Sequence, residues 1–539
     1  MALIVICGGG GKTTLMQKYP DFFLDIDDFI WSYNTNYHDQ LRDAIAVEDM
    51  NTISNIYNTI MVNSRQYLQT QGKIILGHDP IYSEWIGVEL LVQMKPSIRL
   101  HELNIATRTP ELKRIALQNW MDLDNAIIYD DWESFNTLIF KNIHTLNLRI
   151  CKKLTDVSAL GNVHTLNLSH GENITDVSAL RNVHTLNLTN CKKITDVSAL
   201  GKVHTLNLQG CEKITDVSAL GKVHTLNLQG CENITDVSAL GNVHSLNLQN
   251  CYYITDVSAL GNVHILRLSG CNKITDVSAL GNVYDLNLWD CRNITDVSAL
   301  GKVHTLNLWN CNKITDVSAL GNVHTLNLTN CNKITDVSAL GNVHSLNLGD
   351  CDKITDVSAL GNVHTLTLRN CEILTDVSIF KNVHMLELIC CNNITDVSAL
   401  GNVHTLSLLS CENISDVSAL GKVHTLRLAH CQNITDISAL GNVHTLQLFN
   451  CGNISDVSAL GNVYNLELHY CYKITDVSAL GNVYNLSLRG CENISDVSAL
   501  GKVHTLKIAD CDKITDVSAL KNVHTLSLPY RLDNYVKNN

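Results

Sequence analysis

The sequence of 539 residues lacks a long apolar run, a surplus of basic residues and a segment typical of a secretory leader. No apolar run approaches the roughly 18 residues that a membrane-spanning helix needs. The net charge of -13 argues against binding a nucleic-acid backbone, which requires clustered Lys and Arg. The opening MALIVIC is too short for a leader and is followed at once by GGGGK. We therefore expect an intracellular, cytoplasmic chain that binds neither membrane nor nucleic acid.

A second absence is that of clustered cysteines, although the chain contains 20 of them. From Cys151 to Cys511 they recur every 20 residues, with Gly171 as the only gap, and only Cys7 and Cys390 lie outside this series. Whole words such as ITDVSALGNVHTLNL recur with the same spacing. The cysteines are therefore part of an internal repeat rather than a disulfide framework.

One repeat, residues 163–182, predicts a strand followed by a single helical turn. Leu166 and Leu168 alternate with polar residues as in a short strand. The word TDVSAL follows, and Asp176 is placed to accept hydrogen bonds from the next backbone amides, which favours a helical or 3₁₀ turn. A 20-residue unit cannot enclose its own core, so stacked copies must share one, and we expect about 20 parallel strands between Leu146 and Leu526.

This pattern resembles a known family. The segment VHTLNLQGCENI, residues 223–234, fits the leucine-rich repeat pattern LxxLxLxxCxxI, and the ITDVSALGNV half is similar to the corresponding half of internalin-type repeats. The Cys position resembles the cysteine-containing class of leucine-rich repeats. The resemblance covers residues 141–529 and implies a solenoid that binds other proteins.

Three side-chain ladders follow from the period. The Cys ladder is interpreted as buried packing, because zinc sites need ligands clustered as in CxxC, and we expect neither zinc nor haem. The Asp ladder is interpreted as capping. His164 and its equivalents, replaced by Tyr284, Tyr464 and Tyr484 in three repeats, predict a stack of flat polar rings. Such a stack should resist protonation, so we expect stability to fall between roughly pH 6.5 and pH 5.

Variation among repeats falls on the expected concave face, at positions equivalent to 165, 167, 169 and 170. Early repeats carry Thr, Asn, Gln or Ser there, whereas later ones diversify. Aromatic residues and Arg dominate protein interfaces, so two neighbouring Trp form a candidate hot spot; neutral drift among duplicated repeats is the alternative. The candidate partner-binding residues are Trp289, Trp309, Arg369, Phe449 and Tyr470.

The first 133 residues lack the 20-residue period and begin with a pattern typical of a phosphate-binding loop. ALIVIC, then GGGGKTT, then LMQKY follow the order strand, loop, helix. Backbone amides in the loop would converge on phosphate oxygens, Lys12 would contact the β and γ phosphates, and Thr13 would ligate Mg²⁺. The pattern GxxxxGK[ST] has Gly where this chain has Ile6, so either the loop is shortened or a poly-glycine turn imitates it. The candidate cofactor-binding residues are Gly8, Gly9, Gly10, Gly11, Lys12, Thr13 and Thr14.

Further strands are expected at FFLDIDDF and KIILGHD, then at two later apolar segments, SIRLHELNI and NAIIYDDWESF. This order is similar to small P-loop nucleoside and nucleotide kinases. The resemblance implies that Asp25 or Asp27 faces a phosphate acceptor and that Arg108 is a lid arginine.

The sequence therefore predicts an α/β chain with two parts: a three-layer α/β/α P-loop domain with a parallel sheet, followed by a leucine-rich-repeat solenoid. The expected boundaries are residues 1–133 for the P-loop domain, 134–140 for a cap, 141–529 for the solenoid and 530–539 for a polar tail. The predicted function is a protein-interaction scaffold, with a protein partner on the concave face and ATP or another nucleotide with Mg²⁺ at the accessory domain. The alternative is a P-loop kinase that the repeats localise.

Overall fold

The computed structural model describes residues 154–529 without a gap, residues 145–149, four strands nearer the N-terminus, and single positions between 55 and 62 and at 532. The chain divides into two compact units, Met1–Arg267 and Leu268–Asn539. The four early strands are β1 (Ala2–Ile6), β2 (Phe23–Asp25), β3 (Ile74–Gly77) and β4 (Glu89–Lys95).

These four strands belong to the first unit and pair in the order β2-β3-β1-β4, all parallel. Strands are present at the first three predicted segments, whereas β4 lies before the fourth one and was not predicted. The predicted helices, loops and remaining strands of the P-loop domain lie outside the described residues. The α/β/α domain and the boundaries at residues 133 and 141 therefore stay predictions.

The first unit also contains the first repeats. Its repeat strands are β5 (Thr145–Asn147), β6 (Thr165–Asn167), β7 (Thr185–Asn187), β8 (Thr205–Asn207), β9 (Thr225–Asn227), β10 (Ser245–Asn247) and β11 (Ile265–Arg267). Its 3₁₀ turns are η4 (Ser158–Leu160), η5 (Ser178–Asn182), η6 (Ser198–Lys202), η7 (Ser218–Lys222), η8 (Ser238–Leu240) and η9 (Ser258–Asn262).

The second unit continues the same alternation. Its strands are β12 (Asp285–Asn287), β13 (Thr305–Asn307), β14 (Thr325–Asn327), β15 (Ser345–Asn347), β16 (Thr365–Arg369), β17 (Met385–Ile389), β18 (Thr405–Leu409), β19 (Thr425–Ala429), β20 (Thr445–Phe449), β21 (Asn465–His469), β22 (Asn485–Arg489), β23 (Thr505–Ala509) and β24 (Thr525–Ser527). Its 3₁₀ turns are η10 (Ser278–Asn282), η11 (Ser298–Lys302), η12 (Ser318–Asn322), η13 (Ser338–Asn342), η14 (Ser358–Asn362), η15 (Ser378–Asn382), η16 (Ser398–Asn402), η17 (Ser418–Lys422), η18 (Ser438–Asn442), η19 (Ser458–Asn462), η20 (Ser478–Asn482), η21 (Ser498–Lys502) and η22 (Ser518–Asn522).

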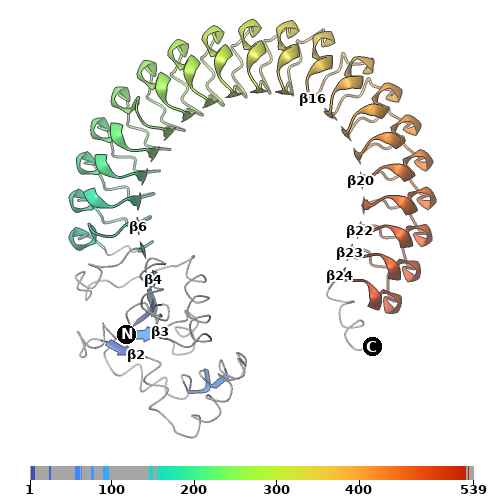
Figure 1. The fold of residues 1–539 in the computed structure, drawn as a ribbon, viewed down its shortest axis with the longest axis horizontal. Coiled ribbons are helices and arrows are strands. Elements are labelled where there is room, and N and C mark those ends of the chain that lie inside the picture. The colour runs from blue at the N-terminus through green and yellow to red at the C-terminus, as the bar shows by residue number, and fades with distance from the viewer. Residues whose placement is uncertain are drawn as a thin grey trace, which may run out of the picture. The chain divides into compact units, whose positions relative to one another are not determined.

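Within each unit, consecutive repeat strands pair in parallel with a register of 20 residues. Leu166 lies opposite Leu186 in the first unit, and Leu306 lies opposite Leu326 in the second. Equivalent residues are therefore neighbours on adjacent strands. The strands line the inner side of each curved unit and the 3₁₀ turns line its outer side (Figure 1). The predicted parallel β ladder with short turns, a leucine-rich-repeat-like solenoid, is confirmed.

The core between strands and turns consists of the predicted apolar positions. In the repeat that begins at Val163, Leu166 and Leu168 of the strand side and Ile174 and Leu180 of the turn side are almost completely buried. The turn itself starts where Asp176 Oδ1 accepts a hydrogen bond from the Ser178 N–H at 2.8 Å. This contact, repeated in each described turn, satisfies a backbone donor that the 3₁₀ turn leaves free.

The strands differ in length because one side chain changes. Asn167 Oδ1 accepts a hydrogen bond from the Ser169 N–H at 3.0 Å, which takes this amide away from the strand ladder. Strands with this Asn have three residues, whereas β16 to β23, which have other residues there, extend to five. Two strands are exceptions: β11 and β24 have three residues, although Arg267 and Ser527 replace the Asn there. The presence or absence of this Asn thus divides the second unit into a part with three-residue strands, β12 to β15, and a part with five-residue strands, β16 to β23.

Candidate functional site

The candidate site is the strand face, defined here as the side chains at positions equivalent to 165, 167 and 169. These alternate with the buried leucines at 166 and 168 and therefore point away from the core. The strand face varies from one repeat to the next, whereas the 3₁₀ turns and the buried positions are nearly identical in all of the described repeats.

Trp289 and Trp309 stack on each other on adjacent strands of the second unit. Their ring centroids are 5.0 Å apart with an interplanar angle of 12°. The side chains remain 38% and 40% exposed. Each Trp backbone N–H donates to the Asn two residues before it, Asn287 at 2.9 Å and Asn307 at 3.0 Å, so the backbone that carries both rings is fixed.

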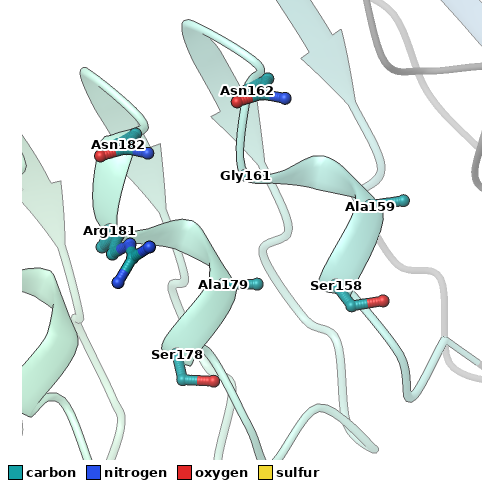
Figure 2. Close-up of a pocket in the computed structure, with 8 residues that line it drawn as sticks. All are labelled: Ser158, Ala159, Gly161, Asn162, Ser178, Ala179, Arg181 and Asn182. Atoms are coloured by element: carbon teal, nitrogen blue, oxygen red, sulfur yellow. The ribbon is translucent and has the colours of Figure 1, made fainter.

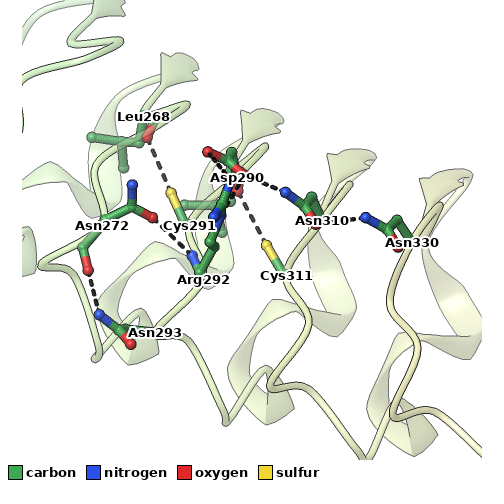
Figure 3. Close-up of polar contacts among 10 residues, drawn as sticks. Leu268, Asn272, Asp290, Cys291, Arg292, Asn293, Asn310, Cys311 and Asn330 are labelled. Carbon is green, nitrogen blue, oxygen red and sulfur yellow. Dashed lines mark hydrogen bonds and ion pairs between the residues drawn. The ribbon is translucent and has the colours of Figure 1, made fainter.

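A polar network holds the turn beside this Trp pair (Figure 3). Arg292 Nε lies 2.8 Å from Asp290 Oδ1, and Asn310 Nδ2 donates to the same carboxylate. Asn330 Nδ2 in turn donates to Asn310 Oδ1 at 2.7 Å. The network fixes the segment after each strand, so the two exposed indoles lose little further conformational entropy when a partner covers them.

The other predicted partner-binding residues form separate clusters on the later strands. Arg369 lies 3.7 Å from Asp350 in an ion pair. The Phe449 ring contacts His469 edge-on, with centroids 4.7 Å apart. Tyr470 lies under Arg489, whose Cζ is 5.9 Å from the ring centroid. The structure thus places Phe449 at the end of β20 and Tyr470 directly after the neighbouring strand β21, apart from the pair of tryptophans along the chain.

Position 170 and its equivalents are constrained in a way that the sequence analysis missed. The backbone there is left-handed in repeat after repeat, with φ of 62° at His170, 61° at Asp290 and 55° at Tyr470. Gly, Asn and Asp tolerate this conformation best, which explains why they dominate the position. The excess of Asn, Asp and Gly at this position is the feature of the sequence from which the left-handed backbone could have been predicted. Variation at 170 therefore reports backbone geometry as well as binding.

The described cysteines of the Cys ladder are buried between the strands and turns, as predicted, except for Cys371, which is partly exposed. Cys291 Sγ donates to the Leu268 carbonyl oxygen at 3.1 Å (Figure 3), and Cys331 makes the equivalent contact with Leu308 at 3.1 Å. Burial raises the pKa of the Cys331 thiol to about 12 and that of Cys191 to about 11. Such thiols are poor nucleophiles and poor metal ligands at neutral pH. Among the described residues, no group of three or more His, Cys, Asp and Glu could hold a metal ion.

The His ladder is a continuous stack within each unit. His324 and His344 have centroids 4.5 Å apart at 11°, and Tyr284 stacks on His304 at the same distance. Where Thr follows the histidine, the His Nδ1 lies 3.2–3.3 Å from the Thr hydroxyl, as in His164 and Thr165 and in His324 and Thr325. The predicted stack of polar rings is confirmed for the described repeats.

Hollows also occur on the turn side of the repeats. One of about 510 Å³ lies between η4 and η5 and is lined by Ser, Ala, Gly, Asn and Arg181 (Figure 2). Equivalent hollows recur between η16 and η17 and between η20 and η21. They arise wherever two turns approach each other: a Cβ on Gly161 would lie 2.2 Å from the Ala179 carbonyl oxygen. Because the same hollow recurs between successive turns, none of these hollows stands out as a candidate binding site.

The predicted nucleotide site cannot be placed. Gly8–Thr14, Asp27 and Arg108 lie outside the described residues, and of Asp25 only the backbone at the end of β2 is described. These roles remain predictions. In the described part of the chain, no helix is long and apolar enough to cross a membrane.

Comparison with known proteins gives no family for the chain. No family model and no curated protein matches it. Among solved structures, an internalin (inlF) from Listeria monocytogenes is 22% identical, with 72% of this chain and 90% of that chain covered and a TM-score of 0.31.

The functional domain of InlJ from the same bacterium, which includes a cysteine ladder, is also 22% identical, over 65% of this chain and 74% of that chain, with a TM-score of 0.37. A leucine-rich-repeat protein of Leptospira interrogans is 18% identical over 75% of this chain and 100% of that chain, with a TM-score of 0.41. At these TM-scores, the assignment of the fold rests on the repeat geometry of the chain itself.

Proposed function

We propose that this protein is an interaction scaffold that binds a protein partner on the strand face of its repeats, with Trp289 and Trp309 as the anchor. The observation that carries the proposal is the stacked, exposed indole pair on a backbone that side-chain hydrogen bonds hold in place. Large aromatic side chains on a preorganised backbone are typical of the few residues that dominate interface energies. Elsewhere at the same position, Gln209 and Gln229 show that the fold does not require Trp.

Replacing both tryptophans with Gln is expected to weaken partner binding by roughly 2 kcal/mol or more, about 30-fold, because the anchor is removed while the repeat keeps a residue that it already tolerates. Partners cross-linked to the wild-type chain would be identified, purified and titrated against both forms. The matched control is Tyr252→Asn with Tyr253→Lys, an exposed aromatic pair off the strand face, replaced by the residues of the next repeat. Equal affinity of wild type and the Gln variant would contradict the proposal.

We propose as a second function that the N-terminal part binds ATP or another nucleotide with Mg²⁺. The supporting observation is the parallel order β2-β3-β1-β4. In this order, β3 and β1 are neighbours at the centre of the four strands. The strand that follows β1 in the chain, β2, lies at one edge, and the strand that follows β3, β4, lies at the other, so the direction of the connections reverses between β3 and β1. Ligands of open α/β sheets bind at such a switch point, beyond the carboxyl ends of the strands. The segment that follows β1 there is Gly8–Thr14.

Calorimetric titration of the full chain with ATP and Mg²⁺ is expected to show saturable binding, and Lys12→Ala is expected to weaken it at least about tenfold through loss of the phosphate contact. Lys18→Ala, a lysine of the predicted following helix, is the control. Absence of binding at millimolar ATP would refute this second function and also the kinase alternative, in which Asp25 or Asp27 faces the acceptor and Arg108 the transferred phosphate.

A further inference from the structure

A second site lies on the strand face of the second unit, over the strands from β16 to β20, and Figure 1 labels the first and the last of these. Here the strand face forms a hollow of about 270 Å³, lined by residues at the positions equivalent to 165 and 167 and by Leu366, Leu386 and Leu406 between them. Glu387 of β17, Ser407 of β18 and Arg427 of β19 lie side by side in the middle row, because they are register partners on consecutive strands. Three consecutive strands thus present an acid, a hydroxyl and a base.

Neither of the two charges is neutralised by an opposite charge in the described repeats. Within the described residues, neither Glu387 nor Arg427 forms an ion pair. Glu387 accepts a hydrogen bond from Thr367 Oγ1 at 3.4 Å, which holds the carboxylate on the sheet. The Arg427 guanidinium lies over the Phe449 ring, with Cζ 5.2 Å from the centroid, which holds it in turn. Both charges are positioned yet unpaired.

Ser407 gives an independent indication of a ligand. Its Oγ is the one buried side-chain polar atom among the described residues that has no hydrogen-bond partner. Buried polar groups in folded proteins almost always have one, so an exception points to a missing group. Ser407 is one of the residues that line the hollow, between the two charges, and its covered hydroxyl lies just beneath this surface. A ligand that bridges Glu387 and Arg427 would supply a partner for Ser407 once its hydroxyl rotates toward the hollow.

An apolar row borders the hollow. Ile389, Leu409, Ala429 and Phe449 occupy the position equivalent to 169 on β17 to β20, where most other repeats carry polar residues or Trp. Ile389, Leu409 and Phe449 are partly exposed. The site therefore offers two opposite charges, one hydroxyl and an apolar border, a combination that suits a peptide better than a small polar molecule.

The spacing of the charges selects the ligand conformation. Glu387 and Arg427 are two strands apart, which corresponds to roughly 10 Å. A polyproline II helix has three residues per turn and rises about 9 Å in one turn, so side chains three positions apart project from the same side of the segment. We propose that this hollow binds an extended, polyproline II-like segment of a partner protein that carries a basic and an acidic residue three positions apart.

This inference rests on the proposed strand-face function and names a second contact on that face. The basic side chain of the segment would pair with Glu387 and the acidic one with Arg427. Backbone groups between them would reach Ser407, and an apolar side chain would lie along the border. Glu467 and Lys507 continue the alternation of charges at the same two-strand interval, so a longer segment with the same repeat of charges would extend over them.

The test uses the full chain and four fluorescein-labelled, proline-rich peptides that differ only in one pair of residues three positions apart: Lys and Glu, Lys and Lys, Glu and Glu, or two Ser. Fluorescence anisotropy at low salt is expected to show wild type binding the Lys/Glu peptide at least about tenfold tighter than the others. The Glu387→Arg variant should prefer the Glu/Glu peptide, and Arg427→Glu should prefer the Lys/Lys peptide. Ser407→Ala should weaken all binding without lowering the thermal midpoint.

Circular dichroism would check that each variant folds, which is expected because both charges lie on the strand face outside ion pairs. Equal affinity for the four peptides, no binding, or an unchanged preference in the two charge variants would overturn the inference. The Trp289→Gln/Trp309→Gln experiment tests the strand-face function separately. Loss of partner binding there, combined with no peptide preference here, would leave the function standing and remove this site.

Discussion

Replacing Phe380 with Ala is expected to lower the free energy of unfolding by about 3–5 kcal/mol. Phe380 is completely buried and is among the largest fully buried side chains that the structure describes. It occupies the turn position that Leu360 and Leu400 occupy in the adjacent repeats. Removing its ring would leave a cavity between η15 and the strands, and close packing on both sides prevents collapse.

The chain supplies the control for this change. Phe380→Leu restores the residue of the neighbouring repeats and is expected to cost less than about 1.5 kcal/mol. Urea unfolding followed by circular dichroism gives the free energies, and hydrogen exchange of the β16–β18 amides shows whether the loss is local, since repeats couple mainly to their neighbours. Similar losses for the Ala and Leu variants would show that the cavity does not determine the effect.

Acidification from pH 7.5 to 5.5 is expected to lower the thermal midpoint, because the stacked histidines resist protonation. Loss of water against the flanking rings, and then the charge of the neighbouring imidazoles, lowers the pKa of His184, His224 and His344 from the ordinary value of 6.5. The unfolded chain then binds more protons than the folded one. The stability is complete above pH 6.5 and is lost as the pH falls below it.

Replacement of His184, His224 and His344 by Tyr tests this mechanism, since Tyr284, Tyr464 and Tyr484 show that the stack accepts Tyr. The variant is expected to retain its midpoint at pH 7.5 and to lose less of it at pH 5.5. Calorimetry at both pH values measures the difference. A midpoint independent of pH in the wild type, or an identical loss in both proteins, would contradict the role of the ladder.

The Asp ladder acts in a separate, lower pH range. The backbone N–H of Ser178 is the main cause that lowers the pKa of Asp176 from the ordinary value of 3.8, and the other described turns repeat the contact. A group whose folded pKa is lowered in this way stabilises the fold above the unfolded pKa and loses that contribution as the pH falls through the folded one. A loss of stability between pH 6.5 and 5 is therefore attributed to protonation of the histidines and not of the Asp ladder.

The sequence by itself determined the repeat architecture of this protein. A 20-residue period with almost identical copies allows only one register, so the buried leucines, the Cys, His and Asp ladders and the adjacency of Trp289 and Trp309 all followed from spacing. The N-terminal part has no such repetition. There the expected strands at β1, β2 and β3 are present, whereas the nucleotide site stays a prediction because it depends on loops outside the described residues.

The tertiary structure decided what depends on backbone conformation and on side chains meeting across strands. The left-handed backbone at Tyr470 follows from the path of the chain between strand and turn, which hydrophobic pattern does not specify. The five-residue strands appear only where the Asn that binds the backbone is absent from consecutive repeats. Likewise, the missing hydrogen-bond partner of Ser407 becomes visible only when the atoms around its hydroxyl are in place, because satisfaction of a buried polar group is a property of the packed neighbourhood and not of the residue.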